Sequence, residues 1–324
     1  MPQGRPIVIA HRGACGYLPE HSLAAKVLAH GFGADYLEQD VILTQDDVPI
    51  VFHDLELESL TDVASHYPDR ARSDGHWYAI DFTLAELRAL SLNERVDPHT
   101  GARTWPRRFA GQGLRFPIVT LEEELELVRA LNAARGTAAG VYTEVKSPAW
   151  HRAQGKDPSR IVLDTLARHG FTGRGANVFL QCFDDEELKR IRGELGSDLK
   201  LIQLVGENAW QEAATDYDRL RSADGLRAVA SYADGVGPSI AMLVGFPGGG
   251  AAAVPSGLCA AAHALGLAVH PYTLRIDSLP PGAASLGEVH RALFEVVRAD
   301  GVFTDFPDLT LAYLNARDGA GHGP

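Results

Sequence analysis

Short apolar segments alternate with amphipathic segments along most of the chain. The first apolar run, Ile7-Val8-Ile9-Ala10, precedes a helical pattern over residues 22–30 that we expect to close at Gly31. A strand pattern follows from Tyr36 to Leu43. Further strands are expected at residues 48–53, 141–146, 178–183, 199–205, 235–236, 267–272 and 302–305. Such alternation predicts parallel strands covered by helices, and about eight repeats favour a closed TIM (β/α)₈ barrel over an open sheet.

Helix start signals support these helices. Residues 83–86 and 120–123 each fit the capping box, in which a threonine and a glutamate three positions later satisfy the first backbone N–H groups. Asp184 precedes a helix expected to run to about Leu195, and Pro307 fits the first turn of the last helix.

The connection after the second strand departs from the alternation. The link from Leu43 to Val48 is too short for a parallel crossover, which needs about a dozen residues. Residues 44–47 therefore predict a hairpin turn that returns the chain toward the strand end. Residues 56–115 contain few strand patterns and many turn residues. We expect residues 1–324 to form one TIM-barrel catalytic domain, with 56–115 as an insertion subdomain over the barrel mouth.

Composition narrows the class of protein. Hydrophobic residues make up 45% and charged residues 22%, which is typical of globular domains rather than disordered or coiled-coil chains. A net charge of -12 argues against nucleic acid and anionic membranes as partners. No uncharged apolar run reaches 18 residues, so no stable membrane insertion is expected. Three cysteines imply no disulfide framework, and the oligomeric state stays open.

Polar and aromatic side chains recur where the expected strands end. In TIM barrels the carboxyl ends of the strands carry the active site, so these residues are expected to meet. They are His11, Arg12, Glu38, Asp40, His53, Asp54, Glu144, Lys146, Gln181, Phe183, Tyr272, Thr304 and Asp305.

Three of these residues are candidate metal ligands. Glu38 and Asp40 stand two apart on one strand, so both side chains face the same way, and Glu144 lies on a later strand. Neighbouring carboxylates in a barrel interior need a cation to stay charged. Carboxylates without cysteine favour Ca²⁺ or Mg²⁺ over Zn²⁺. The alternative is a surface strand with solvated carboxylates, which the flanking Leu37 and Val41 disfavour.

Two histidines are candidates for proton transfer. His11 and His53 both follow expected strands, and imidazole titrates near neutral pH. Taken singly, each is more often a structural histidine, but their equivalent placement favours a catalytic pair. Arg12 and Lys146 are the natural anion binders, and Arg12 can grip phosphate oxygens with two N–H groups.

At this point the motifs resemble a known family, the glycerophosphodiester phosphodiesterases, from Ile7 to about Leu314. The matching motifs, in order, are His11-Arg12-Gly13-Ala14, Leu18-Pro19-Glu20, Glu38-x-Asp40, His53-Asp54, Glu144-x-Lys146, Gln181-x-Phe183 and Thr304-Asp305. Four stretches look more narrowly like the bacterial periplasmic, calcium-dependent subgroup: residues 19–21, 36–40, 78–83 and 270–273.

The resemblance implies metal-dependent hydrolysis of small-molecule glycerophosphodiesters, such as glycerophosphocholine and glycerophosphoethanolamine, to sn-glycerol 3-phosphate and an alcohol. It implies one divalent cation, Ca²⁺ before Mg²⁺, and these residue roles: Glu38, Asp40 and Glu144 as metal ligands, His11 and His53 as acid and base, and Arg12, Lys146, Gln181, Phe183 and Tyr272 as substrate-binding residues. His21 departs from the Asn of many family members. The absence of a signal peptide favours the cytoplasm, whereas a trimmed leader would place the chain in the periplasm.

Other readings remain open from the residues alone. A phospholipase acting on membrane lipids would need an exposed apolar or basic rim, which the net charge disfavours. A non-catalytic binding barrel should have lost a histidine or a metal ligand, and a sugar-isomerase barrel does not explain the paired histidines. The nucleophile is either water or the substrate's glycerol 2-hydroxyl. We expect the hydroxyl, because intramolecular attack gains a large effective molarity.

Overall fold

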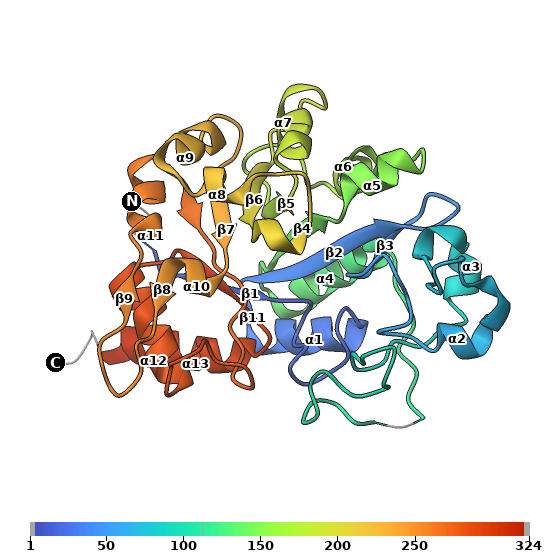
Figure 1. The fold of residues 1–324 in the computed structure, drawn as a ribbon, viewed down its shortest axis with the longest axis horizontal. Coiled ribbons are helices and arrows are strands. Elements are labelled where there is room, and N and C mark those ends of the chain that lie inside the picture. Colours follow the sequence, from blue (N-terminus) through green and yellow to red (C-terminus); the bar gives the residue numbers. More distant parts are fainter. Residues whose placement is uncertain (1–3, 112, 321–324) are drawn as a thin grey trace.

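A barrel of parallel strands forms the centre of the molecule (Figure 1). The computed structural model describes residues 4–111 and 113–320. The parallel strands follow the order β10-β7-β6-β5-β4-β2-β1-β11 around the sheet. Their bounds are Ile7–Ala10 (β1), Tyr36–Leu43 (β2), Gly140–Val145 (β4), Val178–Cys182 (β5), Lys200–Val205 (β6), Gly235–Pro238 (β7), Ala268–Val269 (β10) and Gly301–Thr304 (β11).

The barrel closes between the chain that follows β10 and the last strand. The Leu274 N–H donates to the Phe303 carbonyl at 2.8 Å, and the Phe303 N–H donates to the Pro271 carbonyl at 2.9 Å. A parallel bridge between Leu274 and Thr304 continues this contact. The expected TIM barrel is confirmed, although β10 itself covers only Ala268–Val269 of the predicted strand over 267–272.

Helices surround the barrel, and their ends follow the sequence signals. Thr120 forms the expected capping box at the start of α4, and the Asp184 side chain caps α7. The α1 helix ends at Phe32 rather than before Gly31, because Gly33 is the residue that takes up the left-handed conformation, with φ 92°. The α-helices of six residues or more in the described part of the chain are Leu23–Phe32 (α1), Leu121–Arg135 (α4), Pro148–Ala153 (α5), Pro158–Arg168 (α6), Asp185–Gly193 (α7), Ala223–Val229 (α9), Leu258–Ala264 (α11), Leu286–Arg291 (α12) and Pro307–Ala320 (α13). None of the described helices is both long and apolar enough to cross a membrane.

The predicted hairpin is present. Strand β3 (Pro49–Val51) pairs antiparallel with the end of β2, with Val51 opposite Val41. The Phe52 N–H then donates to the Asp40 carbonyl at 2.8 Å, which brings the following histidine beside the carboxyl end of β2. Strand β3 thus brings the chain back to the barrel mouth.

The segment after the hairpin has its own apolar core. This core is separate from the cluster between barrel and helices, and it joins Ile42 and Ile50 of the hairpin to insertion residues that include Leu57, Leu60 and Phe82. The segment contains the short helices α2 (Val63–His66) and α3 (Leu84–Leu87). We propose that residues 56–115 act as an insertion subdomain.

Side chains inside the barrel form an apolar layer below a polar layer. Ile9, Tyr36, Tyr142, Phe179, Ile202 and Phe303 pack together inside. Because inward-facing positions alternate along a strand, the next inward residues after Tyr36 are Glu38 and Asp40, and the next after Tyr142 is Glu144. Strand alternation therefore delivers three carboxylates to the carboxyl end of the barrel.

Candidate active site

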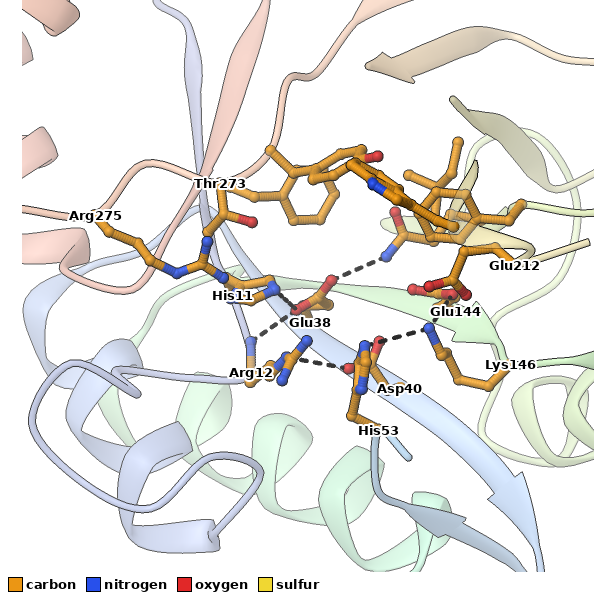
Figure 2. Close-up of a pocket in the computed structure, with 16 residues that line it drawn as sticks. His11, Arg12, Glu38, Asp40, His53, Glu144, Lys146, Glu212, Thr273 and Arg275 are labelled. Atoms are coloured by element: carbon orange, nitrogen blue, oxygen red, sulfur yellow. Dashed lines mark hydrogen bonds and ion pairs between the residues drawn. The ribbon is translucent and has the colours of Figure 1, made fainter. Parts of the chain in front are cut away.

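One cavity at the carboxyl ends of the strands collects the ten residues for which the sequence suggested a metal-binding, acid–base or substrate-binding role. It holds about 190 Å³. Figure 2 shows the side chains of this cavity converging from several strands and from the loops above them. The expected residues that line it are His11, Arg12, Glu38, Asp40, His53, Glu144, Lys146, Gln181, Phe183 and Tyr272.

The three carboxylates form a buried cluster. Ligand oxygens of Glu38, Asp40 and Glu144 all lie within 4.8 Å of one another. Burial, together with the charge of Asp40, raises the pKa of Glu38 to about 8. Burial also raises the pKa of Glu144, although the Lys146 ammonium lies 3.0 Å from its Oε1. The ionised forms of Glu38 and Glu144 are therefore disfavoured in the protein alone. A bound positive charge would favour these ionised forms.

Asp40 is the carboxylate that stays ionised. Burial opposes its charge, but His21 at 2.8 Å and Arg12 at 3.4 Å hold its pKa well below the usual range. The His21 that departs from the common family pattern is thus a direct partner of a candidate metal ligand.

The donor set fits a hard divalent cation. Gln181 donates its Nε2–H to Glu38 at 3.1 Å, and its buried Oε1 has no hydrogen-bond partner among the described residues. A buried amide oxygen without a partner is costly, and it is an oxygen ligand of the kind that Ca²⁺ and Mg²⁺ accept. Three carboxylates and this oxygen make a set of oxygen donors without nitrogen or sulfur.

His11 is held by a buried carboxylate. Its Nδ1 lies 2.6 Å from Asp305 Oδ1, and its Nε2 lies 4.0 Å from Glu38 Oε2. Asp305 also accepts hydrogen bonds from Arg108 at 2.7 Å and Arg275 at 2.8 Å. Burial and the positive charge of Arg12 lower the pKa of His11 to about 4. The ring is therefore fixed in orientation and neutral at pH 7, with Nε2 turned toward the carboxylate cluster (Figure 2).

His53 has the same kind of support. Its Nδ1 lies 2.5 Å from Asp54, which Arg95 grips with two N–H groups at 2.6 and 3.1 Å. Its Nε2 lies 3.3 Å from the Lys146 ammonium. Burial and the charges of Arg12 and Lys146 lower the pKa of His53 to about 3. The cavity thus contains a second histidine with a carboxylate behind it.

The loop after β1 places Arg12 at the centre of the site. Arg12 has a left-handed backbone, with φ 56°, and its N–H donates to Glu38 at 2.7 Å. Its guanidinium donates to Glu20 at 2.6 Å. Gly13 follows with φ 91°, and a Cβ there would lie 2.9 Å from the Ala25 carbonyl carbon. The glycine is required by both the conformation and the close approach.

Several lining residues were not suggested by the sequence. Trp210, Glu212, Thr273 and Arg275 line the same cavity. Arg95 and Arg108 come from the segment between the hairpin and α4, and each pairs with an aspartate behind a histidine. Thr273 and Arg275 could have been found as polar residues just past a predicted strand. Trp210 ends a short 3₁₀ turn, and Glu212, Arg95 and Arg108 lie in irregular segments. None of them has a regular spacing that would signal it in the sequence.

The family comparison covers almost the whole chain. Residues 11–309 match the model of the glycerophosphoryl diester phosphodiesterase family. A glycerophosphodiester phosphodiesterase of Haemophilus influenzae is 40% identical over 329 residues, covering 95% of this chain and 89% of the relative.

Solved structures share the fold. A crystal structure of a protein from Silicibacter pomeroyi superposes with a TM-score of 0.72 at 24% identity and covers 97% of this chain and 95% of that one. A phosphodiesterase from Oleispira antarctica, solved with its product sn-glycerol-3-phosphate, has a TM-score of 0.63 at 22% identity and covers 96% of this chain and 97% of that one.

Proposed function

Since the chain belongs to the glycerophosphoryl diester phosphodiesterase family and is a glycerophosphodiester phosphodiesterase, we propose that it hydrolyses glycerophosphodiesters by metal-dependent histidine acid–base catalysis. The products are sn-glycerol 3-phosphate and an alcohol, and the substrates include glycerophosphocholine and glycerophosphoethanolamine. The Oleispira antarctica relative binds the same phosphate product.

The observation that carries this proposal is the pair of supported histidines beside the carboxylate cluster. His11 with Asp305 and His53 with Asp54 reach the cavity from different strands and share it with Glu38. Two imidazoles are what a phosphodiester needs, because one proton must leave the nucleophile and another must reach the departing oxygen.

Glu38, Asp40, Glu144 and the Gln181 oxygen are the residues that would hold the cation, with Ca²⁺ before Mg²⁺. When bound, it would supply positive charge that offsets the charge on the phosphate's non-bridging oxygens. Arg12 and Lys146 line the same cavity and add fixed positive charge for the phosphate.

The histidines then move the protons. Both are neutral at pH 7, since their pKa values are lowered to about 4 and about 3, so either can accept a proton. The bound phosphate brings negative charge that favours the protonated form of the other ring. One imidazole takes the proton of the attacking hydroxyl, and the other protonates the leaving alkoxide. Asp305 and Asp54 keep each ring in place.

The nucleophile we propose is the substrate's own glycerol 2-hydroxyl. Its oxygen bonds to phosphorus as the bond to the alcohol oxygen breaks, which gives a cyclic phosphate that water then opens. A substrate lacking only this hydroxyl should bind, yet turn over about 10²-fold or more slowly, because the intramolecular advantage is lost. Cleavage within a few-fold of the parent rate would identify water as the direct nucleophile.

The experiment that tests the activity is release of sn-glycerol 3-phosphate from glycerophosphocholine. Chelator should abolish release, and Ca²⁺ or Mg²⁺ added separately should restore it and rank the two ions. Glu38→Ala or Glu144→Ala should remain inactive after ion addition. Full activity of chelator-treated protein would overturn the metal assignment, and no release under any condition would overturn the substrate assignment.

A further inference from the structure

The segment between β6 and α8 (Tyr217–Leu220) contributes two unexplained residues to the cavity. Trp210 ends a short 3₁₀ turn over Asn208–Trp210, and Glu212 follows two positions later. Both line the active-site cavity, and Trp210 is 49% exposed. Figure 2 shows Glu212 directed toward the end of the cavity that contains Glu144 and Lys146. Neither residue has a role in the proton transfers described above.

This segment is fixed rather than loose. The Asn208 side chain accepts a hydrogen bond from the Tyr217 N–H at 2.8 Å and donates to Asp216 and Asp218, each at 3.2 Å. At the root of the segment, a Cβ on Gly206 would lie 3.2 Å from the Trp210 ring. The Trp210 ring therefore packs closely against the backbone at Gly206, and it also lines the cavity.

Glu212 is an unusual neighbour for a phosphodiester. It is exposed, and within the described part of the chain it makes no hydrogen bond or ion pair, although its charge helps to raise the pKa of Lys146. A free carboxylate beside an anionic substrate weakens binding unless another part of the ligand is positive. The ammonium of Lys146, which feels this charge, is already paired with Glu144 at 3.0 Å.

Aromatic rings line the same side of the cavity. Phe183 and Tyr272 meet edge to face, with centroids 5.9 Å apart, and the Tyr272 hydroxyl is tied to the Val205 carbonyl at 2.8 Å. A Cβ on Gly206 would lie 3.2 Å from the Trp210 ring and 3.5 Å from the Phe183 ring, so the indole lies close to these rings in the cavity that Glu212 also lines. Rings of this kind attract quaternary and primary ammonium groups through their faces.

We propose that Glu212 and Trp210 bind a positively charged alcohol group of the substrate, an ammonium such as that of a choline or ethanolamine diester. The inference rests on the proposed function, since it assigns the head-group end of that same cavity. The phosphate lies at Arg12, Lys146 and the carboxylate cluster, and the ammonium lies against the indole and the Glu212 carboxylate. The enzyme should then prefer cationic diesters over diesters of neutral alcohols.

The test compares kcat/KM for glycerophosphocholine and for glycerophosphoglycerol, whose leaving alcohol is neutral. Glu212→Gln and Trp210→Leu should each lower kcat/KM for the choline diester by about tenfold and leave the glycerol diester within about threefold. Glu207→Gln is the matched control, because it removes the same charge from the same segment outside the cavity lining. It should leave the ratio between the substrates unchanged.

A second measurement needs no turnover of the cationic substrate. Tetramethylammonium should inhibit hydrolysis competitively, and Trp210→Leu should raise its inhibition constant by about tenfold. A substrate ratio and an inhibition constant that stay unchanged in both variants would overturn the subsite. If Glu212→Gln lowered kcat/KM for both diesters equally and raised the required ion concentration, Glu212 would be a metal ligand and the subsite would be wrong. Failure of wild type to cleave either diester would instead overturn the proposed function.

Discussion

At the scale of single residues, both candidate catalytic histidines are supported in the same way on Nδ1. Asp305 and Asp54 each bind an imidazole Nδ1 and are themselves bound by arginines. An arginine behind the carboxylate keeps it ionised, and the carboxylate fixes the ring orientation. The Nε2 atom of each ring is consequently the one turned to the cavity, where that of His53 lies 3.3 Å from the Lys146 ammonium.

The first prediction concerns these histidines. His11→Ala and His53→Ala should each lower kcat by about 10²–10⁴, the usual contribution of a general acid or base. The losses should not multiply, because the two groups serve one proton-transfer sequence. Steady-state kinetics of both single variants and the double variant checks this, with His99→Ala, an exposed histidine, as control. A double variant that lost the full product would show that the histidines act independently.

The second prediction concerns the carboxylate cluster and is tested by the free energy of unfolding. Saturating Ca²⁺ should stabilise the wild type by about 2.7 kcal/mol at a hundred times the dissociation constant, and chelator should reverse this. Glu38→Gln should remove the response, since a neutral amide replaces a ligand charge. Thermal unfolding with and without ion measures both proteins.

Glu194→Gln, the same change on an exposed helix end, should respond as the wild type does. An unchanged Ca²⁺ response in Glu38→Gln would place the ion elsewhere.

At the scale of elements, strand β2 carries polar groups on both faces. Glu38 and Asp40 face the cavity, whereas Gln39 faces the helices and donates to Glu124 at 2.8 Å. Glu124 on α4 also pairs with Lys26 on α1 at 2.8 Å, and both side chains are fully buried. Lys26 further donates to the Glu38 carbonyl. One buried cation thus joins two helices to the strand that carries two candidate metal ligands.

The third prediction tests this buried pair. Lys26→Met should lower the free energy of unfolding by about 3–5 kcal/mol, because it leaves the Glu124 charge buried without a cation. Adding Glu124→Gln should recover part of the loss, since the amide oxygen can still accept from Gln39. Urea denaturation of the single and double variants measures the difference. If the double variant were less stable than Lys26→Met alone, the unpaired charge would not be the cause.

At the scale of the whole molecule, acid should destabilise the fold through buried histidines far from the site. His290 on α12 is buried, stacks on Phe294 and bonds to the Thr310 hydroxyl at 3.0 Å. Burial lowers its pKa to about 4. As the pH falls, His290 therefore takes up a proton in the unfolded chain before it does so in the folded protein. The unfolding free energy that neutral His290 provides above pH 6.5 is lost as the pH falls toward 4.

The fourth prediction follows from that difference. Between pH 7 and pH 5, His290→Phe should lose about 2 kcal/mol less unfolding free energy than the wild type. Urea denaturation at both pH values checks this at constant ionic strength. His99→Phe, on an exposed residue, should follow the wild type. Parallel pH dependences of all three proteins would contradict the assignment.

The molecule also assembles its site from distant parts of the chain. Asp305 bonds to His11 across 294 positions, and Arg108 reaches Asp305 across 197. Arg95 joins Asp54 to Glu20. The segment between the hairpin and α4 therefore contributes two arginines, Arg95 and Arg108, which pair with the aspartates behind the two histidines.

The sequence alone was enough to predict the barrel and ten of the residues that line the cavity. Alternation of apolar strands and amphipathic helices is a local property, and parallel strands bring their carboxyl ends to one edge. Glu38 and Asp40 share a face because strand side chains alternate, so their convergence follows from the strand itself. The hairpin followed from a link too short for any other connection.

Only the tertiary structure decided which partner each group has. Asp305 lies behind His11 because β11 pairs with β1, with Thr304 opposite Ala10. The arginines behind both aspartates, and the Trp210 and Glu212 of the β6–α8 segment, depend on loop paths that no periodicity encodes. Burial likewise decided the protonation states, because the pKa values of His11 and Glu38 depend on solvent that the fold removes. Contacts between distant positions leave no local pattern in a single sequence, so the packed barrel had to supply them.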